Sequence, residues 1–153
     1  MSSQKRLSEA DFDALVNSLQ EESFKDAKEA YGDIGLERWR NPKFNGPIEN
    51  ADCELALTGK CGDTIKLFLK FSDERVEKAS YMTNGCASSQ LAGSYTAELA
   101  HGHTAEELFS LTPEDVLKKI GKLPEDDQHC TELAIQVLHE CANAYLVETT
   151  GKT

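Results

Sequence analysis

Three of the five cysteines in this chain stand beside a glycine or beside a residue that can itself bind a metal. They occur in the segments Cys61-Gly62-Asp63, Gly85-Cys86-Ala87-Ser88-Ser89 and His129-Cys130. Together these segments offer three thiolates, one carboxylate and one imidazole, a ligand set that suits a borderline-soft metal ion or an iron–sulfur centre. No two cysteines form the C-x2-4-C knuckle of a zinc finger. The pattern therefore favours a site assembled from segments that are distant in the sequence.

The other two cysteines, Cys53 and Cys141, have apolar neighbours and are expected to be small buried hydrophobic residues. An odd number of cysteines and an N-terminus without an apolar signal segment favour reduced thiols over a disulfide framework. We therefore expect a cytoplasmic protein. His101 and His103 flank Gly102 and are interpreted as residues of a helix end rather than as a metal-binding pair.

Composition limits the classes of partner. The chain has 153 residues, which suits a single domain with a sizeable core. Its 27 acidic and 16 basic residues give a net charge of −11, which would repel a phosphate backbone. No segment approaches the roughly 18 consecutive apolar residues of a membrane span. Neither nucleic acid nor a membrane is an expected partner, whereas a basic protein could dock on the acidic surface.

The first forty residues are predicted to be helical. Ser8 is a candidate N-cap, and apolar residues then recur at helical spacing in Phe12, Leu15, Val16 and Leu19. A second helical stretch is expected over about 22–31, with an interruption at Gly32, and Pro42 ends the helical region. The loop over 43–50 is the expected boundary between this arm and the rest of the chain.

Three strands are predicted next, over 53–57, 64–71 and 76–83. The middle segment alternates apolar and polar residues, as a half-buried strand does. The connections are short, which favours an antiparallel meander.

Helices follow the third strand. We expect one to about residue 100 with Ser88 or Ser89 as its cap, two short ones opened by Thr104 and Thr112, and one over 130–147. Strands followed by helices indicate an α+β fold: a small three-stranded antiparallel sheet with helices packed on one side, plus the N-terminal helical arm. The expected divisions are the arm over 1–40, the main domain over 41–148 and a short tail over 149–153.

These elements would bring the ligand residues to the ends of strands and helices. In an extended backbone Cys61 and Asp63 would leave on the same side. Cys86 precedes one predicted helix and Cys130 begins another, where the free N–H groups favour an anion and lower a thiol pKa. The three segments are expected to converge on one site.

From residue 41 to about residue 146 the chain resembles the IscU/NifU N-terminal type of iron–sulfur cluster assembly scaffold. The resemblance rests on an ordered set of motifs: Asn41-Pro42 after a helix, Cys61-Gly62-Asp63, Gly85-Cys86-Ala87-Ser88-Ser89, Gly102-His103-Thr104, and Leu123-Pro124 before His129-Cys130.

The resemblance implies a scaffold, not an enzyme. A [2Fe–2S] cluster would be built from iron and from sulfur supplied by a cysteine desulfurase, and then passed to acceptor proteins. By position, Cys61, Cys86 and Cys130 match the ligand cysteines, and Asp63 and His129 match the two residues that compete for the remaining coordination position. Cys130 also matches the cysteine that receives persulfide, and zinc is an expected occupant of the cluster-free protein.

Two departures from the family pattern bear on its partners. The family commonly has Leu-Pro-Pro-Val-Lys before His-Cys, a segment that a dedicated Hsp70-type chaperone grasps, but this chain has Leu123-Pro124-Glu125-Asp126-Asp127. The resemblance therefore does not support transfer of the cluster to acceptor proteins with the help of that chaperone. The chain also lacks the insertion that zinc-binding SufU proteins carry between the second cysteine and His-Cys, which favours a scaffold. A SufU-like zinc-binding persulfide acceptor and a purely structural zinc domain remain the alternatives.

Overall fold

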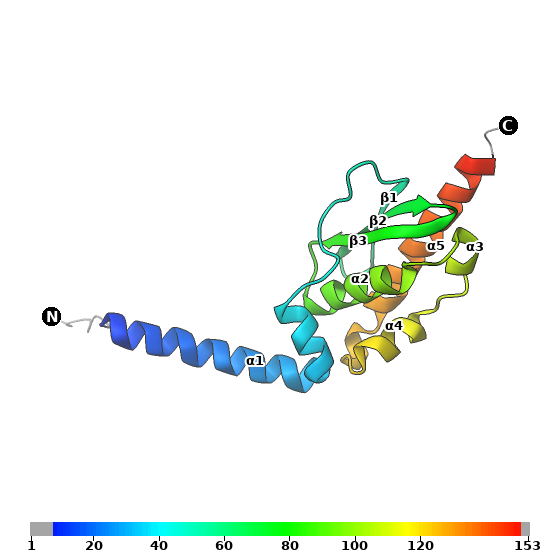
Figure 1. Ribbon diagram of the computed structural model, residues 1–153. Helices are drawn as coiled ribbons and strands as arrows, with labels where there is room; N and C mark the ends of the chain where they lie inside the picture. The colour runs from blue at the N-terminus through cyan, green and yellow to red at the C-terminus, as the bar shows by residue number, and fades with distance from the viewer. Residues whose placement is uncertain (1–7, 151–153) are drawn as a thin grey trace.

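The computed structural model describes residues 8–150 (Figure 1). Its elements follow one another as α1 (Glu9–Arg40), β1 (Cys53–Thr58), β2 (Thr64–Ser72), β3 (Arg75–Thr83), α2 (Ala87–Ala100), α3 (Ala105–Leu108), α4 (Pro113–Ile120), the 3₁₀ helix η1 (Glu125–Asp127) and α5 (His129–Thr150). The three strands form one antiparallel sheet, and helices α2 to α5 follow it in the chain. The predicted α+β fold is confirmed.

The central strand β2 carries much of the core. Its alternate residues Ile65, Leu67 and Leu69 have no solvent exposure and pack with residues of α2 and α5 in a single hydrophobic cluster. Burying each of these side chains contributes about 1.5–3 kcal/mol. The period-2 pattern predicted this face, and the helices do pack on it. The alternation is interrupted by a bulge between Lys70 and Phe71 near the end of the strand.

Helix α1 changes direction at Gly32, whose backbone has the positive φ (76°) that glycine tolerates best. Before Gly32 it is one continuous helix capped by Ser8, rather than the two separate stretches that the sequence predicted. The segment around residues 20–22 consists of good helix formers and contains no breaker. This first part extends away from the body (Figure 1) and leaves Phe12, Leu15 and Leu19 exposed.

After Gly32 the last turns of α1 pack against α2. Arg38 donates hydrogen bonds to Ser94 Oγ (2.9 Å) and Glu98 Oε1 (2.7 Å), and its guanidinium lies 4.1 Å from the centre of the Tyr95 ring. The helix ends at Arg40, one residue before Asn41 and Pro42, as predicted. The end of the arm is therefore attached to the body through a charged and aromatic contact.

Cys53 of β1 and Cys141 of α5 form a disulfide, which corrects the prediction of reduced thiols and isolated buried cysteines. Their Cα atoms are 5.8 Å apart, within the range that a disulfide spans. Both residues lie on apolar faces that turn into the same core. The periodicity of apolar residues identified the buried face of β1 and that of α5, but it could not predict that Cys53 and Cys141 meet where these two faces pack together. Cys61, Cys86 and Cys130 are free, so the predicted sorting of the cysteines into two groups is confirmed.

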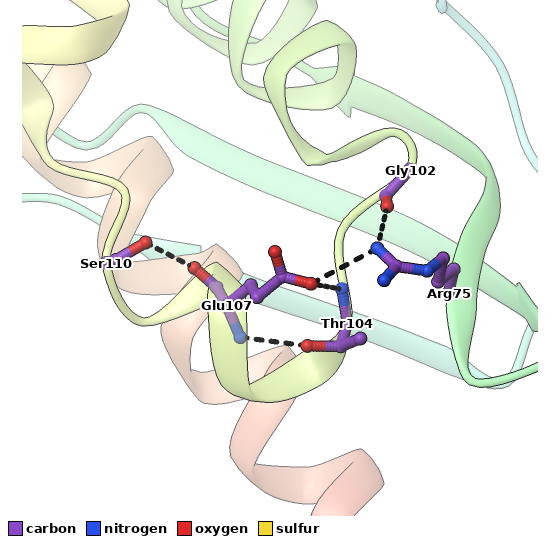
Figure 2. A network of polar contacts seen from close by, with 5 residues as sticks. All are labelled: Arg75, Gly102, Thr104, Glu107 and Ser110. Carbon is purple, nitrogen blue, oxygen red and sulfur yellow. Dashed lines mark hydrogen bonds and ion pairs between the residues drawn. The ribbon is translucent and has the colours of Figure 1, made fainter.

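Arg75, at the start of β3, holds the connection between α2 and α3 (Figure 2). Its Nη1 donates to the Gly102 carbonyl (2.8 Å) and lies 3.2 Å from Glu107 Oε1. Thr104 and Glu107 form the predicted capping box, with distances of 3.2 and 3.1 Å. The backbone hydrogen bond from Thr104 is the largest cause that lowers the pKa of Glu107, and the charge of Arg75 adds to it. These contacts hold the C-terminal end of α2 against the sheet.

The remaining element ends follow the expected local chemistry. Thr112 and Asp115 form a second capping box at the start of α4, which confirms Thr112 as its cap. Helix α5 continues through residues 149–150 of the predicted tail. Residues 1–7 of the predicted arm and 151–153 of the tail lie outside the described residues, and the three-part division of the chain remains a prediction. Over residues 8–150, no helix has the length and apolar character to cross a membrane.

Candidate metal centre

Three segments bring thiol and carboxylate groups together at one end of the sheet. Asp63 lies in the loop between β1 and β2, Cys86 is the residue immediately before α2, and Cys130 lies in the first turn of α5. One ligand atom from each of these residues lies within 4.8 Å of the other two. Two soft sulfurs and one hard oxygen could hold a borderline-soft metal ion. We call these three residues the ligand group.

The loop between β1 and β2 places Asp63 in this group, whereas Cys61 is not among the residues whose ligand atoms lie within 4.8 Å of one another. Gly59 N donates to Asp63 O (2.9 Å), and Gly62 adopts a positive φ of 84° within the turn. Residues 60–62 form a turn rather than an extended segment, so the extended backbone on which the expectation for Cys61 and Asp63 depended is not present. Cys61 is exposed and lines, with His129, a surface cavity of about 400 Å³.

Cys86 itself is the N-cap residue of α2, with an extended backbone, and this helix start has no side-chain cap among the described residues. The prediction that Ser88 or Ser89 caps α2 is therefore wrong. Both serines lie within the first turn and are fully buried. Their hydroxyls bind carboxylates instead: Ser88 donates to Asp127 Oδ2 (2.9 Å) and Ser89 donates to Asp63 Oδ2 (2.8 Å).

His129 has a defined ring orientation. Its Nδ1 lies 2.8 Å from the carbonyl oxygen of Asp126. A carbonyl only accepts hydrogen bonds, so Nδ1 carries the proton and the neutral ring has its free lone pair on Nε2. That Nε2 atom lies 3.8 Å from Cys130 Sγ. His129 can therefore act as a ligand or accept the thiol proton.

Cys130 is the most buried thiol of the site, with 2% of its surface exposed. Burial is the main cause that raises the pKa of Cys130 to about 11, and the hydrogen bond with Ser89 offsets only part of it. Unfavourable electrostatic interactions of the Cys130 thiolate with Cys86, Asp127 and Asp63 raise its pKa further. The expected lowering of the thiol pKa at the start of α5 is therefore outweighed by desolvation. In the metal-free protein Cys130 is a neutral thiol at pH 7.

The structure assigns His101 and His103 no part in the ligand group. His101 is the C-cap residue of α2, and His103 N donates to Ala100 O (3.2 Å) beyond Gly102. Their interpretation as helix-end residues is confirmed.

Sequence reasoning missed the hydroxyl and carboxylate partners around the cysteines. It treated Ser88 and Ser89 as caps and assigned Asp127 no contact in the site. The available signal was that two adjacent serines in one helical turn cannot both be the N-cap, so at least one hydroxyl needed another partner. Which carboxylate each serine meets depends on the packing of α2 against α5 and the β1–β2 loop.

The chain is similar to known proteins over most of its length. Residues 30–152 match the NifU-like N-terminal domain. The iron–sulfur cluster assembly scaffold protein IscU 1 of Archaeoglobus fulgidus is 33% identical over 117 residues, which cover 75% of this chain and 76% of the relative. The scaffold protein IscU of Escherichia coli K12 is 30% identical over 110 residues, covering 69% and 85% of the two chains.

A solved structure shows the same fold. The N-terminal NifU-like protein of Brucella abortus superposes with a TM-score of 0.60 at 23% identity, covering 82% of this chain and 98% of that one. Because the family match extends over most of the sequence and includes all three residues of the ligand group, the chain belongs to the NifU-like N-terminal domain family, among the iron–sulfur cluster assembly scaffolds of the IscU/NifU type.

Proposed function

We propose that this protein binds a [2Fe–2S] cluster while it is assembled from iron and desulfurase-derived sulfur, and then transfers the cluster to acceptor proteins. The observation that carries the proposal is the approach of Asp63, Cys86 and Cys130 to within 4.8 Å of one another from three separate segments. Cys61 and His129 line the adjoining cavity and complete the proposed ligand set. The cluster is the cargo of this site rather than a permanent cofactor.

Cys130 is the proposed persulfide acceptor. Its sulfur would attack the terminal sulfur of a persulfide on the cysteine desulfurase. The S–S bond on the desulfurase breaks, its cysteine leaves as a thiolate, and a new S–S bond forms on Cys130. His129 Nε2, 3.8 Å from Cys130 Sγ, is oriented to accept the proton of the neutral thiol. To become the sulfide of a cluster, the outer persulfide sulfur then takes up two electrons, one from each of two equivalents of an external one-electron donor, and the S–S bond breaks to leave Cys130 as a thiolate.

The ligand types suit temporary binding. Thiolate is a good partner for iron in clusters, whereas the carboxylate of Asp63 is a hard and weaker ligand for such a centre. A protein that stores a cluster would gain from four thiolates. Asp63 is therefore proposed to keep the bound cluster labile enough to be passed on.

The alternative function is a SufU-like zinc-binding persulfide acceptor. Zinc accepts the same sulfur, nitrogen and oxygen ligands in tetrahedral sites, so it is also the expected ion of the cluster-free protein. The fold does not separate this alternative from the scaffold: a putative iron–sulfur cluster assembly scaffold protein for the SUF system, from Fervidobacterium islandicum AW-1, superposes with a TM-score of 0.63 at 19% identity, covering 76% of this chain and 98% of that one.

The proposed partners are a cysteine desulfurase and the acceptor proteins, and the protein is proposed not to be an enzyme. Handover through a dedicated chaperone is not part of the proposal, because Glu125 and Asp127 replace the family's recognition segment. The proposed compartment is the cytoplasm, where three free thiols stay reduced. The Cys53–Cys141 disulfide is buried, at 7% and 0% exposure, which protects it from thiol exchange there.

The test is an anaerobic visible absorption spectrum after incubation with ferrous iron, cysteine, a reductant and a cysteine desulfurase. We expect broad visible absorption in the wild type and its loss in Cys86→Ser. The matched control is Cys53→Ala/Cys141→Ala, which removes two cysteines outside the ligand group and should retain the absorption. A colourless wild type that keeps one zinc ion per chain and accepts persulfide would support the alternative and overturn the scaffold proposal.

A further inference from the structure

Ser89 contacts two members of the ligand group at once. Its Oγ donates a hydrogen bond to Asp63 Oδ2 (2.8 Å) and lies 3.5 Å from Cys130 Sγ. The serine has no solvent exposure. A buried hydroxyl has one proton to donate and is costly to leave without a partner. Ser89 satisfies that need with the carboxylate that a metal would use.

Asp63 and Ser89 both pack closely against the backbone of Gly85. Gly85 faces them directly, and a Cβ at this position would lie 2.7 Å from Ser89 Oγ and 2.8 Å from Asp63 Cγ. Gly85 N is itself held by Thr83 Oγ1 at 3.0 Å. The carboxylate is thus kept between a glycine backbone and a serine hydroxyl, on the side of Cys86 and Cys130.

The neighbouring Ser88 provides a contrast within the same helical turn. It is equally buried, but its hydroxyl binds Asp127 Oδ2 (2.9 Å) and lies 3.3 Å from the Tyr31 hydroxyl oxygen. Asp127 is outside the ligand group. Two adjacent serines therefore hold two different carboxylates, of which only Asp63 is beside both Cys86 and Cys130.

We propose that Ser89 is a positioning residue that holds the Asp63 carboxylate in the ligand group before a metal ion binds. Asp63 is only partly buried, so without this hydrogen bond its side chain can rotate toward water. Binding would then have to order the carboxylate as well as bind the ion. Loss of a partner that orients a metal ligand typically lowers metal affinity about 10–100-fold. The inference rests on the proposed function only in identifying this group as the functional metal site.

The test is an anaerobic titration of the thiol-reduced full chain with Co²⁺, read from its thiolate charge-transfer and d–d absorption bands. We expect Ser89→Ala to bind about tenfold or more weakly, with altered d–d bands because the oxygen ligand is displaced. Ser88→Ala is the matched control, and its affinity should stay within about twofold of the wild type. Ser89→Thr keeps the hydroxyl and should recover most of the affinity.

A double-mutant cycle separates positioning from a general packing defect. If Ser89 acts through Asp63, then Ser89→Ala should change the Co²⁺ affinity by less than about twofold in an Asp63→Ala background. Wild-type affinity in Ser89→Ala, or an equal loss in both backgrounds, would overturn the proposal. Thermal unfolding of each variant checks the fold. Should Ser89→Ala not fold, failure of Ser89→Thr to match the wild-type bands would overturn the proposal.

This measurement uses neither sulfide nor a desulfurase. If the double-mutant cycle shows that Ser89 acts on Co²⁺ affinity through Asp63, but the wild type assembles no cluster, then only the scaffold function is overturned. Cluster assembly by the wild type together with unchanged cobalt binding in Ser89→Ala would defeat the positioning role alone.

Discussion

Cys53 and Cys141, 88 positions apart in the sequence, are bonded to each other inside the core and tie β1 to α5. Helix α5 also carries His129 and Cys130 at its first turn, and β1 leads into the loop that carries Cys61 and Asp63. The disulfide therefore links the two elements that lead to most of the site. It does so without contributing a ligand.

The disulfide predicts a clear separation between stability and binding. A disulfide typically stabilises the folded protein by about 2–4 kcal/mol, and a loop as long as this one favours the upper end of that range. We expect Cys53→Ala/Cys141→Ala to lose about that much free energy of unfolding in urea, while its Co²⁺ affinity stays within about twofold. A reducing agent present during urea unfolding, when the disulfide becomes exposed, should lower the stability of the wild type but not that of the double variant. Equal stability of the two oxidised proteins would contradict the stabilising role.

Asp63→Ala is expected to slow cluster transfer. Removing the hard oxygen leaves the position to His129, a better match for a cluster, and a barrier raised by about 1.4 kcal/mol slows release about tenfold. The measurement is the rate at which the cluster-loaded protein converts an apo-ferredoxin, followed by circular dichroism. Glu140→Ala removes an exposed acid elsewhere on α5 and should transfer at the wild-type rate. An unchanged rate for Asp63→Ala would show that this carboxylate does not govern release.

The reactivity of Cys130 should depend steeply on pH. Burial raises its pKa to about 11, so the reactive thiolate is the minor form at pH 8 and its fraction rises about tenfold per pH unit up to pH 10. In the metal-free protein we expect iodoacetamide to modify Cys130 more slowly than the exposed Cys61 at pH 8. Mass spectrometry of the digested protein measures both rates. A Cys130 rate that is flat between pH 8 and pH 10 would contradict the raised pKa.

Deletion of residues 1–23 should leave the stability of the body nearly unchanged. Along α1, Ala27 is the first buried residue with a described side chain, and Phe12 and Leu19 are exposed. We expect the melting temperature to shift by less than about 2 °C, because exposed residues usually contribute within ~0.5 kcal/mol. Arg38→Ala is the contrasting variant.

The Arg38 side chain is only 10% exposed and pairs with Glu98. Its loss should lower the melting temperature by about 4 °C or more, since hydrogen bonds to charged groups contribute about 1.5–3 kcal/mol. A larger drop for the arm deletion than for Arg38→Ala would mean that the projecting helix stabilises the body.

Local sequence chemistry predicted most of the elements and their ends. The alternation of apolar residues in β2, the capping boxes at Thr104 and Thr112, and the kink at Gly32 each depend on neighbours within about four residues. Prediction from local sequence was wrong for Ser88 and Ser89, which could be either helix caps or buried hydrogen-bond donors. Ser88 and Ser89 have the chemistry of caps, yet burial in the first turn gave their hydroxyls other partners.

The amino-acid sequence by itself determined the α+β order of elements, the division of the cysteines into two groups and the residue types available to a metal. Only the tertiary structure decided that Cys53 bonds to Cys141, that Asp63, Cys86 and Cys130 lie within 4.8 Å of one another, and that Ser89 donates to Asp63. Periodicity and capping depend on interactions along one segment. Partners across the core, and the desolvation that raises the pKa of Cys130, depend on how distant segments pack.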